Sequence, residues 1–73
     1  MRIRINRVDS YVQNSGQPAI RTSVEEYVED DGCWTIADIG VHTTLEDADL
    51  WLATVIPKAT VKLAVGSTIE VDV

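Results

Sequence analysis

The sequence has one cysteine, one histidine and no phenylalanine. A lone cysteine, Cys33, cannot form an internal disulfide, and small secreted domains usually need several, so we expect a reducing compartment. A lone histidine, His42, without a recognisable nucleophile elbow makes no catalytic triad, and we expect it to close a strand and face solvent. Glycine-rich phosphate-binding loops are absent as well. We therefore expect a protein that is not an enzyme and uses no cofactor.

Long apolar runs are also missing. No run approaches the ~20 residues that a transmembrane helix requires, and MRIRINRVDS at the N-terminus alternates, unlike the apolar region of a signal peptide. We expect a soluble, cytoplasmic protein. The 73 residues suffice for one domain, 1–73. A chain of this length buries only about 60% of its unfolded surface and leaves little volume for an enclosed active site.

Positive charge is absent from the middle of the chain. Residues 1–22 carry four arginines and one acid, whereas residues 23–57 carry nine acids and neither lysine nor arginine. Residues 58–73 hold two charges of each sign, so the net charge of −6 comes from the middle segment. Acidity alone can serve solubility, but solubility does not require this segregation, which favours association with a basic partner.

Ten valines, seven isoleucines and seven threonines favour strands over helices. Ile3 and Ile5 alternate with arginines in a half-buried first strand, and a change of phase near Asn6 and Arg7 predicts a bulge there. The second strand should place Ile20, Thr22, Val24 and Val28 on its inner face and Arg21, Ser23, Glu25, Tyr27 and Glu29 on its outer face. Glu26 interrupts the inner row and predicts a second irregularity.

Two turns connect the first three strands. QNSGQP, residues 13–18, has the composition of a loop, and Asp30-Asp31-Gly32 resembles a three-residue turn in which Gly32 has a positive φ. The third strand then runs from Cys33 to about Val41. Hairpins centred near Gly16 and on Asp31 would set Ile3, Val28 and Trp34 in one row of the core. The prediction is a three-stranded antiparallel meander.

One helix follows, with Thr43 or Thr44 as its N-cap and Glu46 or Asp47 completing a capping box. A single buried stripe is expected on it, formed by Ala48, Trp51, Leu52, Val55 and Ile56. Pro57 ends the helix. Alternation in 61–65 and 69–73 predicts two more strands. The expected fold is α+β, an antiparallel sheet in the order β-β-β-α-β-β with one amphipathic helix packed on a face.

A small barrel like the oligonucleotide-binding fold is the alternative, because that barrel also carries a helix between its third and fourth strands. It binds its ligand with basic and aromatic groups on its second and third strands. Here those strands carry four acids, and only Arg21 and Tyr27 are of the basic or aromatic type that such a ligand requires. We therefore expect no direct binding of nucleic acid.

The stretch EEYVEDDGCW, residues 25–34, places five carboxylates within seven residues. It lacks the ligand spacing of a calcium loop, and acids at a solvated turn have no cause for the shifted pKa that catalysis needs. Acidic neighbours also disfavour a thiolate at Cys33, which we interpret as a small half-buried apolar residue. The arginines at 2, 4, 7 and 21 could form a small positive face, but we expect them to pair across strands with Glu25 and Glu29, and Arg4 could also lie over Tyr27.

The remaining interpretation of the acids is a protein-binding surface that joins the hairpin tip to the outer face of the helix. Leu50 lies on the same outer face, away from the buried stripe. The predicted partner-binding residues are Glu25, Glu29, Asp30, Asp31, Glu46, Asp47, Asp49 and Leu50. Such a surface would bind a protein or nucleoprotein complex that has a basic groove.

The segment GVHTTLEDADLWL, residues 40–52, leads from a strand through a threonine cap into an acidic amphipathic helix. In this pattern, and in its size and charge, the chain resembles small phage-encoded inhibitors of the anti-CRISPR type. The resemblance implies a stoichiometric inhibitor that blocks a host nucleoprotein complex, with no cofactor and no turnover. The competing hypothesis is a small assembly subunit or homodimer that pairs through IEVDV, residues 69–73, as an edge strand.

Overall fold

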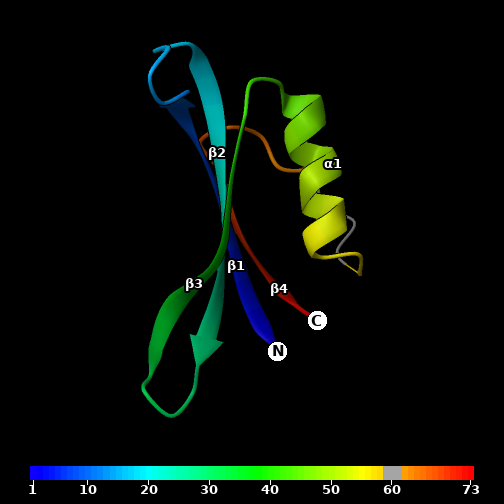
Figure 1. The fold of residues 1–73 in the computed structure, drawn as a ribbon. Helices are drawn as coiled ribbons and strands as arrows, with labels where there is room; N and C mark the ends of the chain where they lie inside the picture. The colour runs from blue at the N-terminus through cyan, green and yellow to red at the C-terminus, as the bar shows by residue number, and fades with distance from the viewer. Residues whose placement is uncertain (59–61) are drawn as a thin grey trace.

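The structure, a computed structural model, describes residues 1–58 and 62–73 (Figure 1). Its four strands form one open antiparallel sheet in the order β3-β2-β1-β4, with a single helix on one face. The α+β fold expected from the sequence is confirmed, and the sheet does not close into a barrel. The elements are β1 (Arg2–Tyr11), β2 (Pro18–Val28), β3 (Cys33–His42), α1 (Leu45–Val55) and β4 (Thr68–Asp72).

The C-terminal part of the chain differs from the prediction of two strands. Val61 lies outside the described residues, and residues 62–64 belong to no strand. Leu63 is instead buried in the core, and the chain reaches β1 through Gly66, whose N–H donates to the Arg7 carbonyl at 2.6 Å. The predicted strand at 69–73 is present as β4, which pairs with β1 at the edge of the sheet.

The bulge expected near Asn6 is absent, because Arg7 itself occupies the inward position that follows Ile3 and Ile5. Its guanidinium is fully buried. Nε donates to Thr22 Oγ1 at 3.0 Å, and Nη1 donates to Asp49 Oδ1 at 2.6 Å and to the Leu63 carbonyl at 2.7 Å. These acceptors offset much of the cost of burying the charge, so the strand continues without interruption.

The second expected irregularity is present, but it lies on β3, opposite Val24 and Glu25 of β2, and not at Glu26. Val24 pairs with Asp38 and Glu25 pairs with Ile36, so Ala37 is an extra residue in β3. An extra residue in one strand exchanges the two faces on either side of it. Side chains of β3 before the bulge therefore lie on the opposite face from the one that unbroken alternation predicts.

This bulge corrects the predicted row of Ile3, Val28 and Trp34. Ile3 pairs with Glu26, and Trp34 pairs with Tyr27 on the face away from the helix. There the two rings meet edge to face, with centroids 5.2 Å apart. Trp34 consequently does not join the sheet to the helix. The row is replaced by a core of Ile3, Ile5, Val24, Leu52, Ile56 and Leu63.

The helix begins and ends as predicted. Thr44 is the N-cap, and its Oγ1 accepts from the backbone N–H of Asp47 at 3.1 Å. The predicted stripe faces the sheet: Ala48, Leu52 and Ile56 are buried, and Trp51 and Val55 are half-buried.

Gly40 allows the helix to approach β3. A Cβ on Gly40 would lie 2.7 Å from the Trp51 ring, a distance that side chains do not tolerate. His42 lies beside the same ring, with centroids 5.6 Å apart, so it is half-buried and does not face solvent as expected. The 11-residue helix is about 16 Å long. Ten-residue β3 spans about 33 Å, so the helix covers only part of it.

Candidate protein-binding surface

The β2–β3 hairpin extends past the helix and projects from the rest of the molecule (Figure 1). We call residues 26–37 the hairpin arm. Its turn spans residues 29–32, and the N–H of Gly32 donates to the Val28 carbonyl at 2.8 Å. Gly32 has φ of 64°, the positive value predicted from the sequence, although the turn holds four residues and not three.

The end of the hairpin arm carries four exposed carboxylates. Glu29, Asp30 and Asp31 lie in the turn, and Glu26 precedes them on the helix side of the sheet. We call these four residues the acidic tip. Within the described residues none of them forms an ion pair. The acidic tip therefore retains its full negative charge toward solvent.

The positive charges that could neutralise this tip are held elsewhere. Arg4 binds Glu25 through two hydrogen bonds, 3.2 Å from Nε and 2.9 Å from Nη2, which confirms the expected cross-strand pair. Arg2 binds Glu70 on β4 at 3.3 Å, and not Glu29 as expected. With Arg7 buried against Asp49, the three arginines of β1 each have an acidic partner away from the tip.

Glu25 belongs to this internal network, although the sequence predicted it as a binding residue. Its carboxylate also accepts from Asn6 Nδ2. The hydrogen bond from Arg4 lowers the pKa of Glu25 below its ordinary value, against the opposing effect of partial burial. The same hydrogen bond raises the pKa of Arg4. A carboxylate already bound in this way has little capacity left for a partner.

The outer face of the arm is fastened by aromatic contacts. The Arg4 guanidinium carbon lies 4.6 Å from the centre of the Trp34 ring, and that of Arg2 lies 4.8 Å from the centre of the Tyr27 ring. Cation–π contacts of this kind contribute roughly 0.5–1 kcal/mol each at exposed sites. They connect β1 to the arm on the face opposite the helix and hold the acidic tip in a defined direction.

The other predicted binding residues lie at the far end of β3. Glu46 and Asp47 are exposed in the first helical turn, and Leu50 is 64% exposed on the outer face of the helix. Ten residues of β3 separate this turn from the acidic tip, about 33 Å of extended chain. Asp49 is engaged by Arg7. Six of the eight predicted residues therefore lie in two separate exposed groups, and the other two, Glu25 and Asp49, are each bound by an arginine of β1.

A feature that the sequence analysis did not identify is the exposed outer side of β3. Ile36 is 61% exposed, Ile39 is 51% exposed and Val41 is 46% exposed. All three lie on the face away from the helix. Alternation assigned Ile36 to one face and Ile39 to the other, and the bulge at Ala37 brings them together. We call these three residues the apolar strip.

Chemical groups suited to catalysis are sparse in the described residues. Nowhere in 1–58 and 62–73 do three histidine, cysteine or acidic side chains converge in an arrangement that could hold a metal ion. Cys33 is exposed and free, and not half-buried as expected. The described helix is too short to cross a bilayer.

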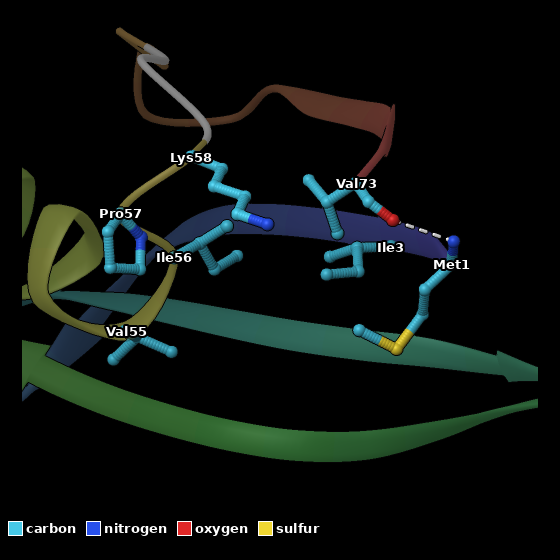
Figure 2. Close-up of a pocket in the computed structure, with 7 residues that line it drawn as sticks. All are labelled: Met1, Ile3, Val55, Ile56, Pro57, Lys58 and Val73. Carbon is cyan, nitrogen blue, oxygen red and sulfur yellow. Dashed lines mark hydrogen bonds between the residues drawn. The ribbon is translucent and has the colours of Figure 1, made fainter.

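One pocket of about 370 Å³ opens between the end of the helix and the two chain termini (Figure 2). Its described lining is apolar except for Lys58 and the backbone of the termini, where the Met1 amino group donates to the Val73 carbonyl at 2.7 Å. None of the side chains in this described lining carries a carboxylate, imidazole, thiol or hydroxyl group. It suits an apolar side chain better than a reacting substrate.

Comparison with known proteins gave no match among protein families, curated proteins or solved structures.

Proposed function

We propose that this protein is a non-enzymatic, acidic protein-binding module that blocks a basic, nucleic-acid-binding surface of a host complex, as an inhibitor of the anti-CRISPR type does. The observation that supports the proposal is the acidic tip, Glu26 and residues 29–31. Four exposed carboxylates project at the end of a fastened hairpin, and the arginines of β1 are held by other acids. Nucleic acid itself is repelled by such a tip.

The chemistry of the tip suits a groove lined by lysine and arginine. Unpaired carboxylates steer a basic partner by long-range attraction, which raises the association rate and weakens with salt. Glu46 and Asp47 present a second exposed acidic group, too far away to share one small groove with the tip. The proposed setting is the cytoplasm of a bacterial host, where an exposed thiol such as Cys33 stays reduced. The gene would belong to a phage or another mobile element.

Assembly through β4 is the second candidate function, because β4 is an edge strand, as expected for residues 69–73. Against it, β4 has only five residues, and its two acids already bind Arg2 and the Met1 amino group. Short, charged edges resist pairing with another chain. The first candidate is therefore preferred.

The experiment that tests the proposal is affinity capture from a nuclease-treated bacterial lysate, washed at low and then at high salt. The tip variant carries Glu29→Gln and Asp30→Asn, and the matched control, which removes the same two kinds of charge, carries Glu46→Gln and Asp47→Asn. We expect one nucleic-acid-handling complex to bind the wild type and the control, to elute with salt and to be lost with the tip variant. Equal capture by the tip variant, or capture only of further copies of the protein, contradicts the proposal.

A further inference from the structure

β3 is an edge strand with unusual exposure. Within the described residues its one neighbouring strand is β2, so the backbone groups on its other side are free. The five consecutive residues from Thr35 to Ile39 are all exposed, so neither face of this part of the strand is covered. The opposite edge, β4, has half the length and is flanked by ion pairs. The bulge at Ala37 interrupts this edge, but the segments on either side of it carry neither lysine nor proline, so they offer a site for addition of another strand.

The two faces of this edge differ in chemistry. On the outer face the apolar strip of Ile36, Ile39 and Val41 runs along the edge. On the helix side, Asp38 is exposed and is the one ionised side chain of β3. The acidic tip precedes the strand, and Glu46 follows it. An added strand would therefore meet apolar groups on one face, and carboxylates on the other face and at the end beside the acidic tip.

This charge distribution decides between possible occupants. An antiparallel second copy that paired the whole of β3 would set Cys33 opposite His42, so that its acidic tip would lie beside Glu46 and Asp47 of this chain. Unpaired carboxylates would then face one another at both ends of the interface, which is destabilising. A segment with basic side chains on one face and apolar side chains on the other satisfies both faces instead.

We infer that the β3 edge binds an extended segment of the partner protein, with alternating apolar and basic residues, as a fifth strand of the sheet. The inference rests on the proposed function, and it adds that the bound segment of the partner is extended. The segment's backbone pairs with β3, its apolar side chains pack on the apolar strip, and its basic side chains face Asp38 and the acidic tip. Main-chain hydrogen bonds provide affinity in this mode, and alternate side chains provide specificity.

The test uses a synthetic peptide in which lysine and valine alternate. Its length of about nine residues lies within the usual range for a strand. The control is the same peptide with alternate backbone nitrogens methylated, which keeps its charge but cannot complete a ladder. Titrations into the ¹⁵N-labelled full chain should perturb the amides of residues 35–41 and leave those of 68–72 unchanged. The methylated peptide should bind at least about tenfold more weakly, the equivalent of 1.4 kcal/mol.

Two variants separate the apolar strip from general surface effects. Ile39→Thr preserves a β-branched side chain at an exposed position, and Leu50→Gln makes a comparable change on the outer face of the helix. Affinity for the lysine–valine peptide should fall about tenfold with Ile39→Thr and remain unchanged with Leu50→Gln. Circular dichroism of both variants verifies the fold.

The contrary outcomes are distinct. If the methylated peptide binds equally well and only residues 29–31 respond, the strand inference is wrong but the proposed acidic surface stands. If neither peptide binds at low salt, the strand inference and the proposed acidic binding surface are both contradicted. If light scattering shows a dimer that Ile39→Thr dissociates, the occupant of the edge is a second copy and the inference is overturned.

Discussion

Replacement of Asp49 by asparagine tests the internal ion pair that the structure reveals. The carboxylate accepts from Arg7 Nη1 at 2.6 Å, and Arg7 is fully buried. After the substitution the guanidinium keeps its hydrogen bonds to Thr22 and to the Leu63 carbonyl, but its charge is no longer balanced. The folded state must then hold an uncompensated cation in the core.

Removal of one partner from a buried ion pair costs about 3–5 kcal/mol. The Asp49 side chain is 35% exposed, so water replaces part of what is lost, and we expect a cost of about 2–3 kcal/mol. A chain of 73 residues has a free energy of unfolding of roughly 4–11 kcal/mol. With a urea dependence of about 1 kcal/mol/M, the midpoint should fall by about 2–3 M.

Equilibrium unfolding in urea, followed by tryptophan fluorescence and by far-ultraviolet circular dichroism, measures this change. Asp38→Asn is the matched control, because Asp38 is exposed and forms no ion pair within the described residues, and it should change stability by less than about 0.5 kcal/mol. The double variant Arg7→Met with Asp49→Leu should regain most of the loss, since it removes both charges. If Asp49→Asn is as stable as its control, the ion pair does not hold Arg7 in the core and the reasoning fails.

Three further outcomes are expected. Gly40→Ala should cost about 1–3 kcal/mol in a thermal or urea melt, because the new methyl would press on the Trp51 ring; an unchanged midpoint would show that the helix shifts freely. Because Arg4 lowers the pKa of Glu25 in the folded state, that contribution is complete above the ordinary value of about 4.5 and is lost as pH falls; the stability difference between wild type and Glu25→Gln should therefore shrink from about pH 6 to pH 3, and a constant difference would refute it. Thr44→Ala should lower the free energy of unfolding by about 1 kcal/mol, whereas Thr44→Ser should leave it nearly unchanged in the same urea titration.

The candidate surface could be predicted from the sequence only in part. The segregation of charge into residues 23–57 correctly indicated an exposed acidic turn at the hairpin tip. It could not show that Asp49 is engaged by Arg7, which is 42 residues away in the chain. It also counted Glu25 as a surface residue, although the expected pairing with an arginine 21 residues away occupies that carboxylate. Pairing across such distances depends on strand register and on where the helix packs.

The predicted register of the second hairpin is wrong in part, because local sequence patterns do not reveal the one extra residue, Ala37, in β3. A hairpin centred on Asp31 is correct for the part of β3 that follows Ala37 in the chain, where Val24 pairs with Asp38. In the part that precedes Ala37 the pairing shifts by one residue, and Trp34 therefore lies on the outer face. The first hairpin is displaced by two residues, which preserves the faces of its strands, so Ile3 and Ile5 remain in the core.

The sequence by itself determined the elements that arise from local chemistry. The β-branched alternation specifies the strands, the threonine cap and proline bound the helix, and Gly32 allows the turn. Only the tertiary structure decided that Arg7 is buried, that β3 bulges at Ala37 and that the apolar strip lies along a free edge. These depend on contacts between distant segments, since a buried charge needs partners from other elements and a bulge is defined by the strand opposite it.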